Sequence, residues 1–296
     1  MGKIRSTMIA DMKLHGYSEQ TINIYTKYAY EYAKFYNKSP LETSLSELKS
    51  FFYSLISQGK SPFILHFYYC SLKYLFTMYN KNYMFQSMVP IKRPTKVPIV
   101  LSMEEVQILL NQFKSLRNKL IFTIIYFSGL RISEALNLTI NDFDLHRNTI
   151  HVQGGKGNKD RITILSKKAK CLLQLYLERN KPTTFLFPSK KYPDKRLHNR
   201  HIQTIFKRAV IESGISKDAH VHTLRHSFAT HLLEKNTNIF YIMKLLGHSS
   251  IQSTLIYLHM QSTDSLNIVS PLDSFEGDLT NHRHKNQLEL DFGIAS

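Results

Sequence analysis

The sequence predicts a mainly α-helical protein with one small antiparallel β-sheet, divided into an N-terminal helical bundle and a mixed α/β second domain. Apolar and aromatic residues recur at helical spacing over most of the chain. Two segments, residues 149–153 and 161–165, instead alternate with the period of a strand on either side of a glycine-rich turn. Three prolines within residues 90–98 separate the two parts.

The first domain, which we place at residues 1–88, should contain four helices. The second of them shows the clearest apolar face, made by Ile22, Tyr25, Ala29, Tyr32 and Tyr36. Helix-terminal signals mark each boundary: Gly16 after the first helix, Ser18 before the second, Ser44 with Glu47 before the third, and Ser61 with Pro62 before the fourth.

Residues 89–98 form a basic, proline-rich linker, because closely spaced prolines resist helix formation. Its cations Lys92, Arg93 and Lys96 are candidate contacts for an anionic partner. The second domain should then run over residues 99–273, followed by a polar tail at residues 274–296.

In the second domain, Ser102 and Glu105 form a capping box for the first helix, and residues 120–127 are apolar nearly all round, which predicts a buried central helix. The two predicted strands flank residues 154–158, so Lys156 should project from a hairpin tip. Five further helices are expected, at residues 168–179, 200–213, 222–234, 238–246 and 251–258.

The charge of the chain points to a polyanionic partner. Among 296 residues there are 39 Lys and Arg against 22 Asp and Glu, a formal net charge of +17. Residues 1–96 hold 13 basic and 5 acidic side chains, and residues 97–273 hold 24 and 13, whereas the tail is slightly acidic. Both domains should therefore contact the same nucleic acid.

Other partners and compartments are disfavoured by composition. Two cysteines, Cys70 and Cys171, make neither a disulfide framework nor a metal site. There is no N-terminal signal pattern, and the longest apolar run, residues 120–127, is too short to span a bilayer. We therefore expect a soluble cytoplasmic protein without a membrane partner.

Six residues form a constellation suited to phosphodiester chemistry: Arg131, Lys156, His222, Arg225, His248 and Tyr257. Guanidinium groups stabilise the charge that develops on the non-bridging oxygens of a phosphate under attack. Arg131 and Arg225 are the candidates for this clamp, and His222 lies three residues before Arg225 on the same helical face. The other interpretation of Arg131 is a surface arginine paired with Glu134.

Lys156 and Tyr257 are the candidates for general acid and nucleophile. A lysine whose pKa is lowered by neighbouring cations can protonate a leaving oxygen, although Lys156 could equally belong to a phosphate-contacting basic turn with Lys159 and Arg161. The chain has 17 tyrosines, and Tyr257 is set apart from the other 16 because it follows closely on His248. Tyr241 is the second candidate nucleophile, but its apolar helix favours a packing role.

A metal site is the competing interpretation of the histidines. His222 and His226 lie four residues apart, as in metal-binding helices, and His231 or His248 could add a ligand. The glutamate that metal hydrolases carry inside such a pair is absent. We therefore expect no metal and no cofactor, and interpret His226 and His231 as structural hydrogen-bonding residues.

These motifs resemble the tyrosine recombinase, or phage integrase, family. The resemblance runs through residues 129–134 (GLRISE), 155–161 (GKGNKDR), 222–231 (HTLRHSFATH) and 246–250 (LGHSS), in that order, and ends with Tyr257. It implies that the N-terminal bundle is a SAM-like core-binding domain and the second domain is catalytic. It also implies that five residues surround the scissile phosphate while Tyr257 attacks it to form a 3′-phosphotyrosyl link: Arg131, Lys156, His222, Arg225 and His248.

The same resemblance implies recombination of double-stranded DNA with inverted-repeat sites through a Holliday junction, by a homotetramer on DNA that is a monomer or dimer when free. Within the family, the sequence is similar to Xer recombinases and integron integrases. Only 65 residues separate Lys156 from His222, which leaves no room for the helical insertion of integron integrases. We therefore expect the integrase of a mobile element or a Xer-like resolvase.

The tail carries a second, shorter resemblance. Its residues Gln287, Leu288, Leu290 and Phe292 resemble the pattern by which bacterial proteins dock on the replication sliding clamp. Packing on a neighbouring protomer and simple disorder are the alternatives. Two other functions for the whole chain also stay open at this point: a topoisomerase-like relaxing enzyme that uses the same tyrosine, and a DNA-binding or architectural protein without chemistry.

Overall fold

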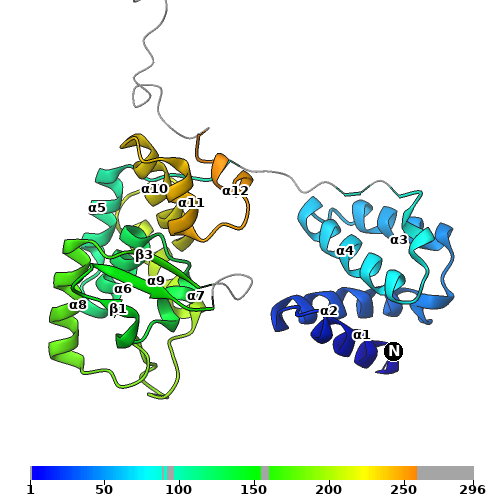
Figure 1. Cartoon of the computed structure of the whole chain (residues 1–296). Coiled ribbons are helices and arrows are strands. Elements are labelled where there is room, and N and C mark those ends of the chain that lie inside the picture. Colours follow the sequence, from blue (N-terminus) through cyan, green and yellow to red (C-terminus); the bar gives the residue numbers. More distant parts are fainter. Residues whose placement is uncertain (1, 89, 92–96, 155–159, 259–296) are drawn as a thin grey trace, which may run out of the picture. The chain divides into compact units, whose positions relative to one another are not determined.

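The computed structural model describes residues 2–88, 90–91, 97–154 and 160–258, and the chain divides into two compact units, Met1–Lys96 and Val97–Ser296 (Figure 1). The first unit is helical, as predicted. Its elements are α1 (Gly2–Leu14), α2 (Glu19–Tyr36), the 3-10 helix η1 (Pro40–Glu42), α3 (Leu45–Ser57), α4 (Pro62–Met78) and the 3-10 helix η2 (Asn82–Phe85).

The predicted helix starts of the first unit are confirmed. The Ser18 and Ser61 side chains accept hydrogen bonds from Thr21 N and Ile64 N, and Ser44 forms the expected capping box with Glu47. Each cap satisfies backbone N–H groups that have no partner inside the helix. The two 3-10 helices were not predicted, because three- or four-residue elements carry no periodic pattern.

Aromatic side chains fill the core of the first unit. Tyr32 is fully buried, contacts Phe51 edge to face with ring centroids 4.8 Å apart, and donates a hydrogen bond to Thr43 Oγ1 at 2.9 Å. A buried tyrosine needs such a partner for its hydroxyl. The predicted apolar face of α2 is therefore the face that packs against α4.

The second unit combines eight α-helices with one small sheet among its described residues. The helices are α5 (Met103–Gln112), α6 (Leu116–Ser128), α7 (Ile132–Asn137), α8 (Lys167–Asn180), α9 (Asn199–Glu212), α10 (Val221–Glu234), α11 (Ile239–Leu246) and α12 (Gln252–Leu255). The remaining elements are the 3-10 helix η3 (Ile140–Asp142) and the strands β1 (Phe143–Asp144), β2 (Thr149–Val152) and β3 (Arg161–Ile164).

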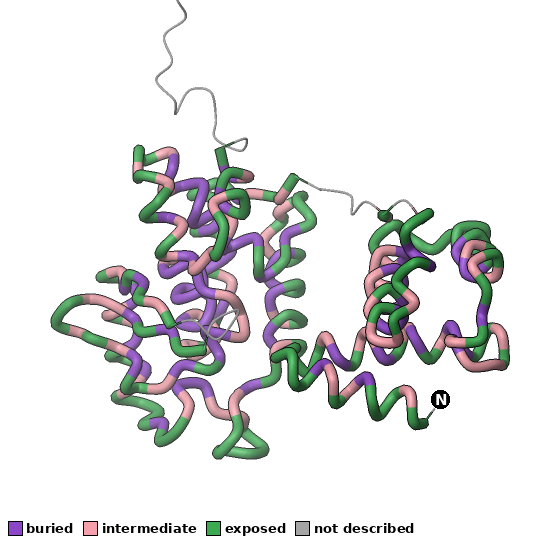
Figure 2. The backbone as a smooth tube through the Cα atoms, turned by 45° about the vertical axis from the view of Figure 1, so that its right-hand side comes forward, coloured by how far each residue is buried: buried purple, intermediate pink, exposed green. Residues whose placement is uncertain are grey.

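Helix α6 is the buried centre of this unit. Its residues from Leu120 to Tyr126 are at most 6% exposed. Figure 2 shows that buried segments, in purple, gather in the interior of this unit. Helix α6 packs against α5, α7, α8, α10 and β3. The all-round apolar pattern predicted this position. Helix α6 contacts α7 and α10, and candidate site residues lie at the beginnings of these two helices.

The sheet has the order β1-β2-β3 and is antiparallel throughout. Thr149 pairs with Ile164 and Val152 pairs with Arg161. Alternation places Ile150, Val152 and Thr163 on the buried face. Arg161 lies two residues before Thr163 in β3, so its side chain points toward the interior as well.

Short elements account for the differences from the sequence-based prediction in this unit. The six-residue helix α7 and the two-residue strand β1 were missed, and the last expected helix, residues 251–258, is only the four-residue α12. Among the described residues, no helix is both long enough and apolar enough to cross a membrane.

Candidate active site

Arg131 is positioned by the turn that ends α6. Gly129 closes this helix with a φ of 62°, and a Cβ added there would lie 2.5 Å from a ring carbon of Phe228. Glycine is therefore required both for its backbone angle and for space. The sharp turn places Arg131 at the N-cap of α7, with a side chain that is 22% exposed.

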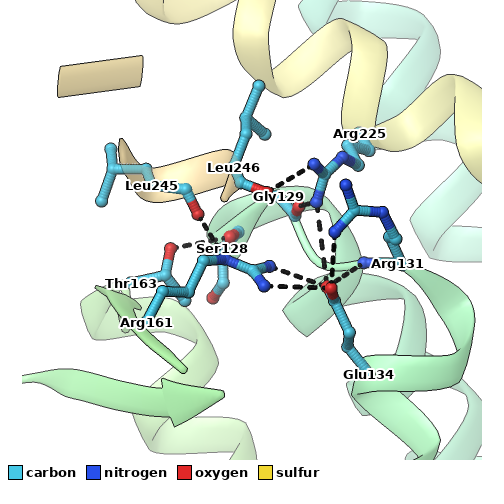
Figure 3. Close-up of polar contacts among 9 residues, drawn as sticks. All are labelled: Ser128, Gly129, Arg131, Glu134, Arg161, Thr163, Arg225, Leu245 and Leu246. Atoms are coloured by element: carbon cyan, nitrogen blue, oxygen red, sulfur yellow. Dashed lines mark hydrogen bonds and ion pairs between the residues drawn. The ribbon is translucent and has the colours of Figure 1, made fainter. Parts of the chain in front are cut away.

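Three arginines converge on the carboxylate of Glu134 (Figure 3). Arg131 donates from Nη1 to Oε1 at 2.7 Å, and Arg161 donates from both terminal nitrogens at 2.9 and 2.7 Å. Arg225 Nη1 lies 3.8 Å from Oε2. Burial alone would raise the pKa of Glu134, but hydrogen bonds and charge from Arg161 and Arg131 hold it at about 2.

Arg225 is fully buried and held by two backbone carbonyls. Nη1 donates to Gly129 O and Nη2 donates to Leu246 O, both at 2.6 Å. Burial and the charge of Arg131 lower the pKa of Arg225 to about 9, so it stays charged at neutral pH. The two carbonyls come from the ends of α6 and α11, so the guanidinium is positioned by backbone rather than by flexible side chains.

Arg161 differs from the expected DNA contact. Its guanidinium is occupied by the two bonds to Glu134 and by a third from Nε to Leu245 O at 2.9 Å, and its side chain is only 8% exposed. The alternation of β3 explains this placement, because it turns Arg161 to the same face as Thr163. We correct the DNA-contact assignment of Arg161 to a bridge between β3, α7 and α11.

His248 is positioned by the end of α11. Gly247 closes this helix with a φ of 65°, and a Cβ there would lie 2.7 Å from Cδ of Arg161. A 2.8 Å hydrogen bond then joins His248 Nδ1 and the buried Thr254 Oγ1. Burial first, and then the charges of Arg225 and Arg131, lower the pKa of His248 to about 4.

Tyr257 is buried among histidines, with 2% of its surface exposed. Its hydroxyl lies 3.1 Å from Nδ1 of His226, and its ring stacks on His248 with centroids 6.3 Å apart. Burial raises the pKa of Tyr257, whereas the charges of Arg225 and Arg131 act to lower it. The hydroxyl is thus within the electrostatic reach of both guanidinium groups.

His222 and His226 extend this cluster along one face of α10. Their rings meet edge to face with centroids 4.6 Å apart. Burial is the main cause that lowers the pKa of both histidines, and the charge of Arg225 adds to it. Because the His222 side chain is exposed, solvent weakens this lowering of its pKa. His226 is more enclosed, its pKa is about 3, and it is neutral at pH 7.

The structure brings five of the six predicted catalytic residues into one cluster: Arg131, His222, Arg225, His248 and Tyr257. Lys156, the sixth, and Lys159 lie outside the described residues. So do the linker cations Lys92, Arg93 and Lys96 and the tail residues Gln287, Leu288, Leu290 and Phe292.

Tyr241 and His231 differ in how their positions compare with the sequence-based expectations. Tyr241 is 64% exposed, so the expectation that it packs in the interior is wrong. His231 does form a structural hydrogen bond, between its Nδ1 and the Tyr126 hydroxyl, at 2.8 Å. In the part of the chain that the structure describes, no three His, Cys, Asp or Glu side chains are grouped to hold a metal ion.

The cluster carries more positive than negative charge. Three guanidinium groups share one carboxylate, and the surrounding histidines are neutral. Unbalanced charge in a poorly hydrated site is costly, so the site favours an anionic ligand. A tyrosine hydroxyl beside such an anion-binding site could attack a bound phosphate ester.

Sequence comparison agrees with this geometry. Residues 100–263 match the family model described as "Phage integrase family", and residues 4–84 match "Phage integrase, N-terminal SAM-like domain". A tyrosine recombinase of Thermosipho africanus is 32% identical over 280 residues, covering 90% of this chain and 97% of the relative. Tyrosine recombinase XerD of Listeria monocytogenes is 33% identical and covers 83% of this chain and 89% of the relative.

Solved structures with the same fold include two recombinases. The crystal structure of XerH site-specific recombinase bound to palindromic difH substrate, a post-cleavage complex, superposes with a TM-score of 0.71 at 26% identity, over 82% of this chain and 77% of that one. A lambda integrase (75-356) dimer bound to a COC′ core site gives the same TM-score at 17% identity, over 87% of this chain and 94% of that one, and shows the fold alone.

Proposed function

This chain belongs to the phage integrase family and is a tyrosine site-specific recombinase, and we propose that Tyr257 is its nucleophile. The hydroxyl attacks a DNA phosphodiester, forms a 3′-phosphotyrosyl bond and releases a 5′-hydroxyl. The observation that carries the assignment is the buried Tyr257 hydroxyl, held by His226 beside three arginines that share a single carboxylate.

Four residues would hold the scissile phosphate: Arg131, Arg225, His222 and His248. The guanidinium groups compensate the charge that accumulates on the non-bridging oxygens, so their contribution is larger in the transition state than in the bound substrate. Lys156 would protonate the leaving 5′ oxygen, which makes it the general acid. Because the bond energy is kept in the phosphotyrosyl ester, the partner strand's 5′-hydroxyl can reverse the reaction without ATP or a metal ion.

The described form requires an opening step before this chemistry. Arg225 and Tyr257 are at most 2% exposed, and Arg225 Nε is closed off from solvent without an acceptor among the described residues. A phosphate can reach these groups only if the segment between α11 and Tyr257 moves. We therefore propose that DNA binding opens this segment and delivers the nucleophile.

We propose double-stranded DNA with inverted-repeat sites as the substrate, acted on by a homotetramer through a Holliday junction. The relatives named above support this assignment, and the net charge of +17 suits a duplex. Lys92, Arg93, Lys96 and Lys159 are the proposed backbone contacts. We propose that the protein acts on cellular DNA in the cytoplasm, as the integrase of a mobile element or a Xer-like resolvase.

We also propose that the tail hexapeptide at residues 287–292 docks on the replication sliding clamp. A segment with spaced apolar side chains suits a shallow groove and gives weak, reversible binding. A pull-down of purified clamp should succeed with the wild-type chain and fail after Leu288→Ala and Phe292→Ala. Equal recovery from both proteins would contradict the proposal.

A nicked duplex tests the nucleophile, because loss of the short fragment traps the covalent intermediate. The probe is the inverted repeat that the protein protects from nuclease digestion in the DNA that flanks its gene. Wild type and Tyr241→Phe should form a protein–DNA adduct that survives denaturant, whereas Tyr257→Phe should bind the duplex without forming one. An adduct with Tyr257→Phe would show that another residue attacks.

A further inference from the structure

His226 contacts the reacting atom of the proposed mechanism, yet the motif analysis gave it only a structural role. Among the described residues, His226 Nδ1 is the side-chain atom hydrogen-bonded to the Tyr257 hydroxyl, at 3.1 Å. The charged neighbours of the hydroxyl, Arg131 and Arg225, carry donors only and cannot accept a proton. His248 uses its Nδ1 on Thr254 instead. The nucleophile's proton therefore has one direct acceptor in this closed arrangement, and a role in catalysis requires that the contact is kept or formed again after DNA opens the segment.

We propose that His226 is the general base that accepts the proton of Tyr257 as the hydroxyl attacks the phosphate. This inference rests on Tyr257 being the nucleophile. In the Nε2–H tautomer of His226, Nδ1 is free to accept and the phenol donates. As the bond from Tyr257 Oη to phosphorus forms, the proton moves to Nδ1. The bond from phosphorus to the 5′ oxygen breaks, and that oxygen takes a proton from the general acid.

The reverse reaction uses the same proton. When the 5′-hydroxyl of the partner strand attacks the phosphotyrosyl ester, it returns its proton to the deprotonated general acid. The bond from phosphorus to Tyr257 breaks, and the phenolate oxygen takes the proton back from His226. The base is thus regenerated in each round of cleavage and joining, and no other reactant is consumed. This is the behaviour that a reversible strand exchange requires.

The surroundings of His226 indicate when this base is active. Facing it are His222 and Arg225 on α10, His248 after α11, and Tyr257 after α12. Without DNA, burial and the charge of Arg225 disfavour a protonated His226, while burial disfavours a phenolate at Tyr257. The tyrosine therefore stays protonated and unreactive. A phosphate placed among the arginines would offset their positive charge and make His226 a stronger base.

The substitution His226→Asn distinguishes a general base from a residue that only positions Tyr257. In His226→Asn, the amide oxygen can occupy the place of Nδ1 and accept the hydrogen bond of Tyr257, but it cannot take up the proton. We expect cleavage of the nicked duplex under single-turnover conditions to slow by about a hundredfold or more, the usual scale for losing a general base, while DNA affinity stays within a factor of about two. Cleavage at the wild-type rate would overturn the proposal.

His231→Asn is the matched control. His231 lies on the same helix and also bonds a tyrosine hydroxyl through Nδ1, at 2.8 Å from Tyr126, but takes no part in the proposed chemistry. The His231→Asn variant should cleave at the wild-type rate. Thermal unfolding of both variants reports whether they fold. If wild type itself forms no adduct, the assignment of Tyr257 fails, whereas wild-type activity with an unimpaired His226→Asn removes only the role of His226.

Two further measurements keep the proposal testable if the asparagine variant does not fold. In His226→Ala, added imidazole should restore cleavage, and rates with a series of substituted imidazoles should rise with their pKa. A substrate with sulfur in place of the bridging 5′ oxygen needs no protonation of its leaving group. It should rescue Lys156→Ala but not the His226 variants. Absence of imidazole rescue in a folded His226→Ala, or rescue by the sulfur substrate, would contradict a general base.

Discussion

Glu134 holds the cationic side chains of the site in place. It is 7% exposed and receives hydrogen bonds from Arg131 and Arg161, whose five donors per guanidinium suit a bidentate carboxylate partner. Removing one charged group from such a buried network leaves the remaining charges buried without a partner. The resulting loss of unfolding free energy exceeds the net contribution of an intact ion pair.

The pKa of Glu134 leads to a pH-dependent prediction. Its folded value of about 2 lies below the ordinary 4.5, so the carboxylate stabilises the fold above pH 4.5 and loses this contribution as the pH falls toward 2. The shift corresponds to about 3 kcal/mol. Glu134→Gln should therefore unfold in less urea than wild type at pH 7, and the difference in unfolding free energy should shrink below pH 4.5. A difference that stays constant between pH 3 and pH 7 would contradict the charge network.

Arg131 and Arg225 should matter for chemistry more than for binding. Arg131→Ala and Arg225→Lys are each expected to slow adduct formation by about a hundredfold, since a transition-state donor is lost, while duplex binding survives. Arg208, which is exposed on α9 and pairs with Glu212, provides the control: Arg208→Ala should leave cleavage unchanged. Normal adduct formation by the folded Arg131 or Arg225 variants would remove them from the site.

The sequence predicted the grouping of Arg131, Arg225, His248 and Tyr257 because the motifs that carry them occur in a recognisable order. Arg131 and His248 also each follow a glycine that ends a helix. The sequence did not predict that Arg161 would turn inward, although the two-residue period of the strand carried that information. The contact of His226 with Tyr257 was also missed. It depends on how the segment after α11 folds back onto α10, and no local pattern encodes that long-range contact.

At the level of elements, the site depends on where helices end. Gly129 and Gly247 end α6 and α11, and the carbonyls of Gly129 and Leu246 hold Arg225. The helix starts were predicted well, since caps are local signals. Short elements such as α7 and β1 were not, because packing against α6 and β2 stabilises them rather than their own propensity.

Gly129→Ala tests the turn that ends α6. The substitution combines a strained positive φ with a clash against Phe228, for an expected loss of about 2 to 5 kcal/mol of unfolding free energy. Gly214 has a similar φ of 71° but open space around it. Gly214→Ala should therefore cost only about 1 to 2 kcal/mol. Equal destabilisation of the two variants would show that the space beside Phe228 is not limiting.

The corrected position of Arg161 also has a measurable consequence. Because its guanidinium bridges β3, α7 and α11, Arg161→Lys should lower the thermal stability but leave the salt dependence of DNA binding unchanged. A phosphate contact, by contrast, would reduce the slope of log affinity against log salt by about one. A reduced slope would restore Arg161 to the DNA interface.

At the scale of the whole molecule, the charge distribution sets the mode of binding. Both units have an excess of basic residues, within a net charge of +17. Binding to duplex DNA should weaken steeply as salt increases, because each neutralised phosphate releases counterions. Affinities measured at several salt concentrations check this prediction. A flat response would mean that the basic residues of the two units do not contact the DNA backbone.

Helical periodicity, the proline-rich linker and the glycine-rich turn were enough to predict a helical unit followed by a mixed one. The family could be identified because its motifs are spread in a fixed order over most of the second unit. The closed state of Tyr257 was beyond prediction, since burial of a side chain depends on the packing of distant elements.

Peptide mapping of the covalent adduct tests the central claim most directly. The adduct trapped on the nicked duplex is digested with trypsin and nuclease, and mass spectrometry locates the nucleotide that stays attached. We predict a 3′-linked nucleotide on Tyr257 alone. A nucleotide on Tyr241 or any other residue, or a 5′ linkage, would contradict the account.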